Sequence, residues 1–322
     1  MTLENKIRKS LYGAILGDAL GVPVEHSTRQ ELALCSVKNM LGYGRYDQPK
    51  GTWSDDSSMI LCTCDALLDD YNLDRIARNF ERWLFEGFWT PYGHVFDSGL
   101  TTVTALESFR SGVSAYESGQ KTIDDNGNGS LMRILPAALY FSDLPVDDFI
   151  EKIHEICAIT HGHARAKTGC GIYSLIIRRL LCSPTEKLPA IHQAVDQARQ
   201  YYAGREPYDS ELSHFSRIIN HQIAALKEAD IHSSGYVVDT LEASLWCFLR
   251  HYDTKSILLS AINLGLDTDT TATVAGGLAG LVYGLDSIPS DWLSSLARKN
   301  DIDQLIHAFA ETIIQNRVPG DL

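Results

Sequence analysis

The sequence predicts an all-α fold, and three observations support this prediction. Apolar residues recur at the spacing of amphipathic helices along almost the whole chain. No series of alternating β-branched runs separated by hairpin turns is present. No long Pro-, Gly- or Ser-rich linker divides the 322 residues. We therefore expect one compact multi-helix domain over residues 1–322, although this length is typical of roughly two domains.

The expected helices follow from the apolar periodicity, and irregular segments connect them. One of these connections is the Gly- and Asn-rich stretch Asp124–Ser130. In chain order, the expected helices are Lys6–Leu20, Ser57–Asp69, Leu73–Phe85, Gly99–Phe109, Val146–Thr160, Ala164–Leu181, Ala190–Tyr202, Leu212–Ala229, Thr240–Arg250, Ser256–Leu264, Thr270–Tyr283 and Ile302–Gln315.

Glycines recur at every fourth residue near the end of this series, at Gly276, Gly280 and Gly284. Residues four apart share one face of a helix. Because glycine destabilises a helix interior, its recurrence indicates that another backbone packs very close to this face.

Composition excludes several classes of protein. Hydrophobic residues make up 44% of the chain and charged residues 21%, which excludes a disordered chain and a small disulfide-stapled scaffold. The net charge of −13 argues against a general nucleic-acid binder, since a phosphate backbone would be repelled. Composition alone leaves open whether some of these carboxylates gather to hold cations.

Cysteine spacing and hydropathy indicate a reducing, aqueous environment. The seven cysteines form no CxxC pair, so we expect reduced core cysteines rather than a zinc site. The most apolar stretch, Val274–Leu285, is too short to span a bilayer, and the first residues lack a secretory hydrophobic region. We therefore expect a cytoplasmic protein without a membrane partner.

Two acidic clusters stand at expected helix starts. Ser54, Asp55 and Asp56 follow a Gly-Thr-Trp turn, and Asp267, Asp269 and Thr270 open a late helix in the same way. Helix capping explains each cluster alone, because hydroxyl and carboxylate side chains stabilise helix N-termini.

Hard oxygen ligands of this kind are also those that Mg²⁺ and Mn²⁺ prefer. If the two helix starts face each other, four carboxylates converge, and their repulsion would require cations. The clusters together therefore predict a binuclear metal centre.

Two motifs of other enzyme families match these acidic residues only in part. The run Asp267–Thr271 matches the DxDxT of haloacid-dehalogenase-type phosphatases, but it follows a helix-like segment late in the chain instead of an early buried strand. A terpene-synthase-like DDxxD fails because Met59 stands three positions after Asp56.

Seven separated segments carry a more specific signal than either cluster: Gly13–Glu25 (GAILGDALGVPVE), Gly51–Met59 (GTWSDDSSM), Phe96–Thr102 (FDSGLTT), Asn126–Pro136 (NGNGSLMRILP), Thr160–His163 (THGH), Gly235–Trp246 (GYVVDTLEASLW) and Asn263–Gly280 (NLGLDTDTTATVAGGLAG). Together and in this order they resemble the ADP-ribosylglycohydrolase family, which includes ADP-ribosylarginine and ADP-ribosylserine hydrolases. The resemblance runs from about Ile7 to Leu285.

The resemblance implies a single all-α domain that holds two divalent cations, Mg²⁺ or Mn²⁺, in a cleft. Their implied ligands are Ser54, Asp55 and Asp56 on one side and Asp267, Asp269 and Thr270 on the other. The implied catalytic carboxylates are Glu25, Asp97 and Asp269. Glu25 would bind metal or water or act as an acid or base, and the residues alone do not divide the acid and base roles between Glu25 and Asp97.

The resemblance also implies a substrate site. The loop residues Gly127, Asn128, Gly129, Ser130, Leu131 and Met132 would wrap a diphosphate, as glycine-rich segments before helices can. His161 would contact ribose or phosphate, Tyr236 would stack on adenine, and Arg133 would support the loop or touch the ligand. Without the resemblance, an ordinary turn, a surface or capping histidine and a core aromatic would explain these residues.

The expected activity is hydrolysis of an ADP-ribosyl bond at C1″ of the distal ribose, with an arginine-linked protein as the preferred substrate. A serine linkage, an ADP-ribose-bearing small molecule and a non-catalytic ADP-ribose binder are the alternatives. We expect a monomer. One departure stands out: many members have Gly-Gly before the second cluster, whereas this chain has Gly265-Leu266. Leu266 could reshape the pocket rim and so change substrate preference.

Overall fold

The computed structural model describes residues 1–182 and 186–317, and this part of the chain is all-α, as expected. It contains no extended strand, only the isolated bridges Tyr43–Gln48, Gln120–His161 and Gly127–Tyr236. Two of these bridges lie at loops that form the candidate site described below.

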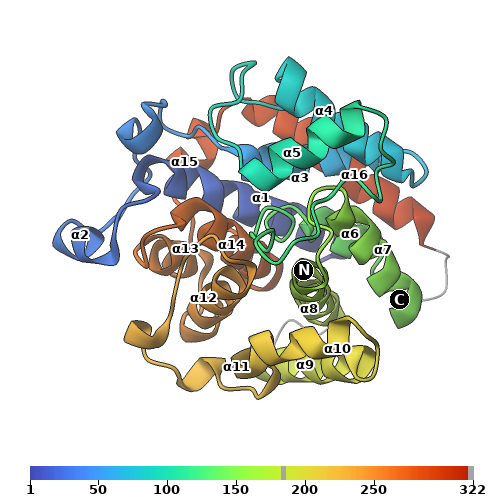
Figure 1. The fold of residues 1–322 in the computed structure, drawn as a ribbon. Coiled ribbons are helices and arrows are strands. Elements are labelled where there is room, and N and C mark those ends of the chain that lie inside the picture. The colour runs from blue at the N-terminus through green and yellow to red at the C-terminus, as the bar shows by residue number, and fades with distance from the viewer. Residues whose placement is uncertain (183–185, 318–322) are drawn as a thin grey trace.

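Loops and 3₁₀ turns join the α-helices (Figure 1). Their bounds are α1 (Leu3–Gly21), α2 (Arg29–Leu34), α3 (Asp55–Ala66), α4 (Leu73–Glu86), α5 (Leu100–Arg110), α6 (Leu135–Tyr140), α7 (Val146–Ala158), α8 (Ala164–Cys182), α9 (Lys187–Tyr202), α10 (Tyr208–Glu211), α11 (Ser216–Ile219), α12 (Val237–Arg250), α13 (Thr254–Ile262), α14 (Thr268–Tyr283), α15 (Ser290–Ser295) and α16 (Lys299–Asn316). The connections from α2 to α3 and from α5 to α6 are long.

Most expected helices are present with ends shifted by a few residues, but the helix expected over Leu212–Ala229 is wrong. This segment is broken into α11 and the 3₁₀ turns Leu212–Phe215, Ile223–Ala225 and Glu228–Asp230. The backbone reverses at His221, which adopts a φ of 58°. Apolar side chains of the segment are nevertheless buried, so their helix-like spacing reflects anchoring to the core and not a continuous helix. The short helices α2, α6, α10 and α15 were not expected.

The centre of the fold is a close pair of helices from opposite ends of the chain, α1 and α14. A Cβ atom on Gly13 would lie 2.1 Å from the carbonyl oxygen of Gly276, and one on Gly280 would lie 2.0 Å from that of Lys9. The expected close backbone approach is therefore confirmed for Gly276 and Gly280. Gly284 instead ends α14 with a φ of 68°.

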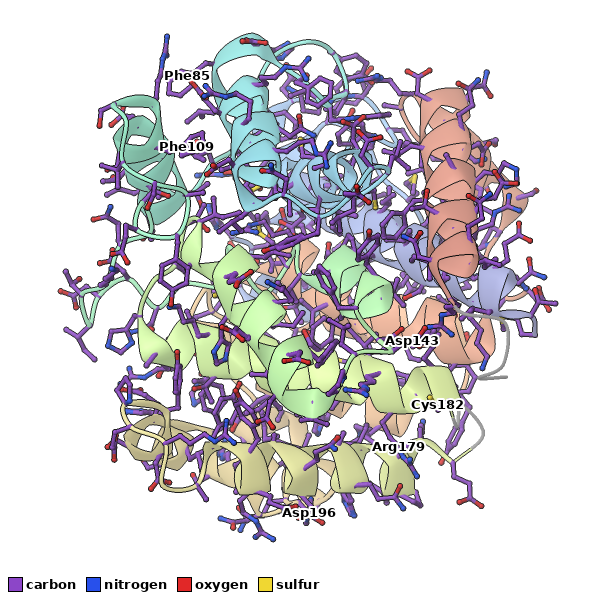
Figure 2. The ribbon with its side chains drawn as sticks, turned by 90° about the vertical axis from the view of Figure 1, so that its right-hand side faces the viewer. Phe85, Phe109, Asp143, Arg179, Cys182 and Asp196 are labelled. Carbon is purple, nitrogen blue, oxygen red and sulfur yellow. The ribbon has the colours of Figure 1, made fainter. Side chains whose placement is uncertain are left out.

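Other helices surround this pair. α13, α12 and α8 pack on α14, and α16 and α3 pack on α1, while α4 and α5 lie side by side beyond α3 (Figure 2). This arrangement brings the C-terminal end of α1 and the N-terminal ends of α3 and α14 to one place, because all three helices share the core.

The cysteines are free, but not all lie in the core as expected. Five are buried, whereas Cys35 and Cys182 are exposed, and Cys182 lies at the end of α8 (Figure 2). Across residues 1–182 and 186–317, no helix combines the length and apolar character needed to cross a membrane.

Candidate active site

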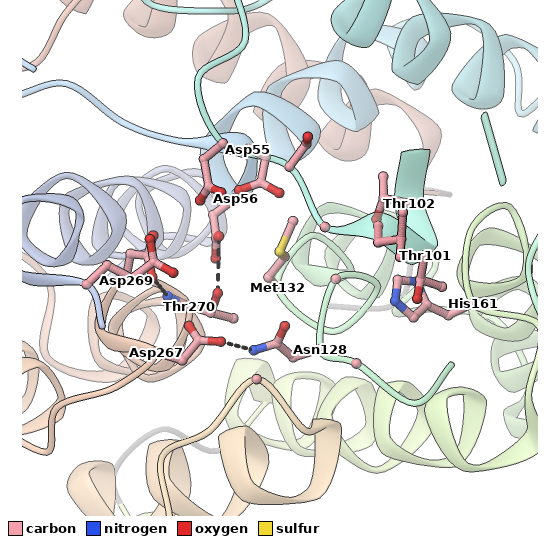
Figure 3. A pocket seen from close by; sticks show the side chains of 18 of the residues that line it. Asp55, Asp56, Thr101, Thr102, Asn128, Met132, His161, Asp267, Asp269 and Thr270 are labelled. Carbon is pink, nitrogen blue, oxygen red and sulfur yellow. Dashed lines mark hydrogen bonds between the residues drawn. The ribbon is translucent and has the colours of Figure 1, made fainter. Parts of the chain in front are cut away.

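A cavity of about 390 Å³ opens where the starts of α3 and α14 face the loops before α5, α6 and α12 (Figure 3). Its lining comes from seven distant parts of the chain and is rich in oxygen atoms. The lining residues are Glu25, His26, Asp55, Asp56, Asp97, Ser98, Gly99, Leu100, Thr101, Thr102, Gly127, Asn128, Gly129, Met132, His161, Gly235, Asp267, Asp269 and Thr270.

The first acidic cluster stands at the start of α3. Ser54 is the N-cap, and its Oγ accepts from the Asp56 N–H at 3.4 Å, so the capping role is confirmed. The Ser54 hydroxyl donates to Asp18 Oδ1 at 2.8 Å. Because its proton is used in this way, a lone pair of Ser54 Oγ is free to face a cation. Asp55 and Asp56 line the cavity, whereas Ser54 lies beside them, off its wall.

Asp18 is a site residue that the sequence reasoning missed. It is fully buried in α1 and accepts hydrogen bonds from the backbone N–H and hydroxyl groups of both Ser54 and Ser57. It thereby ties α1 to the first turn of α3. A lone aspartate within the apolar run GAILGDALG was the available signal for a buried, hydrogen-bonded carboxylate.

The second acidic cluster meets the first across the cavity. The Thr270 hydroxyl donates to Asp56 Oδ2 at 3.2 Å, and Asn128 Nδ2 donates to Asp267 Oδ2 at 2.8 Å (Figure 3). Asp267 is the N-cap of α14, yet its side chain makes no capping hydrogen bond. Capping therefore does not explain Asp267, and the expected convergence of the two helix starts is observed.

A third group of carboxylates closes the site. One oxygen from each of Glu25, Asp97 and Asp269 lies within 4.8 Å of the others, a geometry that could hold a metal ion. Tyr46, which the sequence reasoning also missed, donates to Glu25 Oε2 at 2.5 Å. Nothing in its local sequence marks Tyr46, because its position depends on how the loop after α2 folds back.

The site concentrates negative charge in a buried place. Burial, followed by the charge of neighbouring carboxylates, raises the pKa of Asp55, Asp56 and Asp269 well above the usual range and that of Glu25 to about 8. The oxygens Asp56 Oδ1 and Asp267 Oδ1 are buried without a hydrogen-bond partner among the described residues. Unpaired buried oxygens among mutually repelling carboxylates are what a divalent cation would satisfy, so the residues fit the implied metals.

The glycine-rich loop contributes only part of its length to the cavity. Gly127, Asn128, Gly129 and Met132 line it. Ser130 and Leu131 are fully buried, and the Ser130 hydroxyl accepts from the thiols of Cys157 and Cys170 on α7 and α8. These two residues thus anchor the loop from behind.

Of the two residues expected to contact a ligand through their rings, only His161 lies on the cavity wall. Tyr236 is half-buried outside the lining, and the guanidinium of Arg165 lies 5.9 Å from its ring centroid. Its segment supports the loop through the backbone instead, since Asn128 N–H donates to the Gly235 carbonyl and Val237 N–H to the Asn126 carbonyl.

Leu266 precedes Asp267 in the chain but does not itself line the cavity. It adopts a φ of 61°, which glycine adopts with less strain, and it is 44% exposed. Its carbonyl accepts from His26 N–H and its N–H donates to Ser27, both at 2.7 Å. Leu266 therefore connects the loop that follows Glu25 to the loop that precedes Asp267.

The chain is similar to known proteins along most of its length. A family model described as ADP-ribosylglycohydrolase matches residues 1–319. The chain is 29% identical to the ADP-ribosylarginine hydrolase Tri1 of Serratia proteamaculans (strain 568), over 94% of this chain and 78% of that protein. It is 30% identical to the ADP-ribosyl-[dinitrogen reductase] glycohydrolase of Rhodospirillum rubrum, over 92% of each. A solved structure titled ADP-ribosylglycohydrolase-related protein complex superimposes with a TM-score of 0.80 at 27% identity, over 97% of this chain and 99% of the other.

Proposed function

Since the chain belongs to the ADP-ribosylglycohydrolase family and is an enzyme of that family, we propose that it removes ADP-ribose from modified arginine side chains of proteins. The proposed reaction is hydrolysis of the N-glycosidic bond at C1″ of the distal ribose. Water supplies the hydroxyl group that C1″ receives, and the guanidine leaves with the proton it needs. The similarity to the Serratia ADP-ribosylarginine hydrolase supports the arginine linkage.

The convergence of six carboxylates on one cavity carries this proposal. Two divalent cations, Mg²⁺ or Mn²⁺, would be held by Ser54, Asp55 and Asp56 from α3 and by Asp267, Asp269 and Thr270 from α14. When bound, such cations supply positive charge and Lewis acidity for the ribose hydroxyls and the attacking water. The unpaired oxygens of Asp56 and Asp267 support this assignment.

Glu25 and Asp97 would manage the proton at the leaving group. Both line the cavity, and both lie within reach of Asp269. Glycoside cleavage passes through a transition state of oxocarbenium character, which nearby carboxylates stabilise. The hydrogen bond from Tyr46 would hold Glu25 in a fixed orientation toward the reacting bond.

The loop Gly127–Gly129 would hold the diphosphate. All three residues line the cavity, and the Asn128 side chain donates a hydrogen bond to Asp267. Without side chains, the glycine backbones can approach phosphate oxygens closely. The diphosphate would then lie beside the acidic centre, with the distal ribose toward the carboxylates.

Incubation with ADP-ribosyl-arginine and ADP-ribosyl-serine peptides tests the proposal, with Mg²⁺ and Mn²⁺ varied and free ADP-ribose measured. Release from the arginine peptide is the expected result. The double variant Asp267→Asn/Asp269→Asn should lose activity and bound metal together. Asp74→Asn/Asp148→Asn is the matched control, because it removes two exposed carboxylates that also lie in the first turns of helices.

The outcomes separate the proposal from its alternatives. Release from the serine peptide alone would correct the linkage, and turnover of free ADP-ribosyl compounds alone would correct the substrate class. Release from no substrate, with ADP-ribose still bound, would leave a non-catalytic binder and overturn the proposal.

A further inference from the structure

A buried arginine lies behind the cavity without a carboxylate partner. Arg133 is fully buried, and its guanidinium stacks 4.4 Å from the centroid of the Phe80 ring. Both terminal nitrogens donate to the Ile156 carbonyl at 3.3 Å, and one of them also donates to Thr160 Oγ1 at 2.7 Å. The described residues show no ion pair to this guanidinium, so packing and these hydrogen bonds alone hold it.

The bond to Thr160 sets the direction of the next hydrogen bond. Thr160 Oγ1 lies 2.8 Å from His161 Nδ1. A guanidinium only donates, so the Thr160 oxygen accepts from Arg133. Thr160 is fully buried, and within residues 1–182 and 186–317 its hydroxyl hydrogen has no acceptor other than His161 Nδ1. The hydroxyl therefore donates to Nδ1, and the imidazole carries its proton on Nε2.

The position of the His161 ring is fixed just as closely. Its backbone N–H donates to the Cys157 carbonyl at 3.0 Å, and the Gln120–His161 bridge secures the segment. A Cβ atom on Gly129 would lie 2.9 Å from His161 Cε1, and one on Gly127 would lie 3.6 Å from Nε2. The Nε2 edge thus lies over the glycine-rich loop, at the cavity wall.

We propose that Arg133 and Thr160 are positioning residues that fix His161 as its neutral Nε2–H tautomer, so that Nε2 donates a hydrogen bond to a phosphate oxygen of the nucleotide over Gly127–Gly129. The ligand half of this inference rests on the proposed function, whereas the tautomer does not.

The electrostatic surroundings agree with a neutral imidazole. Burial, and after it the positive charge of Arg133, lowers the pKa of His161 to about 3. A neutral imidazole has a single N–H donor, so this N–H must point toward the ligand in order to donate to it. Its natural partner is an acceptor such as a phosphate oxygen.

Nitrogen-15 NMR of the wild-type protein at pH 7 tests the tautomer directly. Imidazole nitrogen shifts distinguish protonated from unprotonated ring nitrogens, and the spectrum of His161→Gln identifies the His161 signals. We expect a protonated Nε2 and an unprotonated Nδ1. A proton on Nδ1, or on both nitrogens, would overturn the inference without any reference to substrate.

Calorimetric titration of the metal-loaded protein with ADP-ribose tests the ligand contact. Thr160→Val keeps the shape of the side chain but removes the hydroxyl, so it should shift the tautomer signals and weaken ADP-ribose binding about tenfold, the size of one hydrogen bond. Thr160→Ser restores the hydroxyl and should restore both readings. If Thr160→Val does not fold, the wild-type spectrum still decides the tautomer, and Thr160→Ala, which also lacks the hydroxyl, replaces it in the titration.

The failures are distinguishable. Unchanged binding and tautomer signals in folded Thr160→Val would overturn this inference and leave the proposed function intact. Absence of ADP-ribose binding by the wild-type protein would instead refute the proposed function, and with it the ligand half of the inference.

Discussion

Gly21 is the residue through which the central helix pair most directly controls the site. It ends α1, and a Cβ atom there would lie 2.3 Å from Asp269 Cα and 2.4 Å from Asp269 N. Carbon atoms pack without repulsion at about 3.5–4.0 Å. Gly21→Ala must therefore displace the Asp269 backbone from α1 by roughly 1.5 Å, because the obstructing atoms belong to backbone and not to a flexible side chain.

Two consequences of this displacement can be given magnitudes. Overpacking costs about 1–3 kcal/mol of folding free energy. The displacement also separates Asp269 from Glu25, which follows α1, and so opens the group formed by Glu25, Asp97 and Asp269. A misplacement of about 1 Å at a reacting centre can cost roughly 100-fold in rate. We therefore expect Gly21→Ala to lower kcat/KM about 100-fold.

Gly280→Ala is the matched control. Its Cβ atom would lie 2.0 Å from the Lys9 carbonyl oxygen, a clash of the same kind, but roughly three turns, or about 16 Å, further along α14 from Asp269. Urea unfolding of both variants and ADP-ribose release at a temperature where both are folded give the comparison. Similar stability losses with activity lost only in Gly21→Ala are expected. Equal activity in the two variants would refute the link between helix spacing and the site.

Three further predictions concern the site and its support. Chelation should lower the melting temperature, and adding Mn²⁺ or Mg²⁺ should restore it. At a metal concentration of 100 times Kd the free energy of unfolding should rise by about 2.7 kcal/mol, and by much less in Asp56→Asn. A wild-type melting temperature that does not depend on metal would contradict the metal assignment. Asp18→Asn should lower the free energy of unfolding in urea by about 1.5–3 kcal/mol for each hydrogen bond from Ser54 or Ser57 that the amide cannot accept. It should also weaken metal binding measured by titration. Wild-type values in both measurements would show that Asp18 does not hold the start of α3. Burial lowers the pKa of His154 to about 3 from an unfolded value near 6.5, so its contribution to stability is complete above about pH 6.5 and is lost as pH falls toward 3. The stability gap between wild type and His154→Gln should therefore shrink by about 2 kcal/mol between pH 7 and pH 5, and a gap that does not change with pH would be evidence against this linkage.

Local patterns predicted most of the fold because helices depend on local spacing. The glycine spacing of α14 indicated that another backbone packs close to it. It could not indicate which one, because α1 lies at the other end of the chain. The broken segment after Leu212 shows the limit. Apolar residues at helical spacing can be buried by successive short turns, and the reversal at His221 has no strong local signal.

The site was predictable to the extent that its chemistry stands at helix starts. The clusters around Asp55 and Asp267 are visible as runs of oxygen-bearing residues, and their convergence follows from how α3 and α14 pack. Glu25 and Asp97 came only from the family resemblance. Tyr46 could not be found, because it reaches Glu25 through a loop whose path is a tertiary property.

The direction of side chains in an irregular loop was equally beyond sequence. Ser130 follows Gly129 in the glycine-rich segment, yet it turns to the thiols of Cys157 and Cys170 while Asn128 turns to Asp267. Neighbouring residues in a loop lack the fixed periodicity that assigns faces in a helix. Only the positions of α7, α8 and α14 decide which of them meets the cavity.

The carboxylates of the site repel one another, so they cannot be what assembles it. The force that gathers them comes from contacts outside the cavity: the backbone packing of α1 against α14 and the hydrogen bonds that Asp18 accepts from the start of α3. These contacts involve no group that a cation would bind, apart from Ser54. The fold should therefore survive removal of divalent cations, with a lower stability that reflects the unrelieved repulsion. Helix packing therefore positions the carboxylates before any cation binds, and bound cations would lower the energy of the site by relieving the repulsion between them.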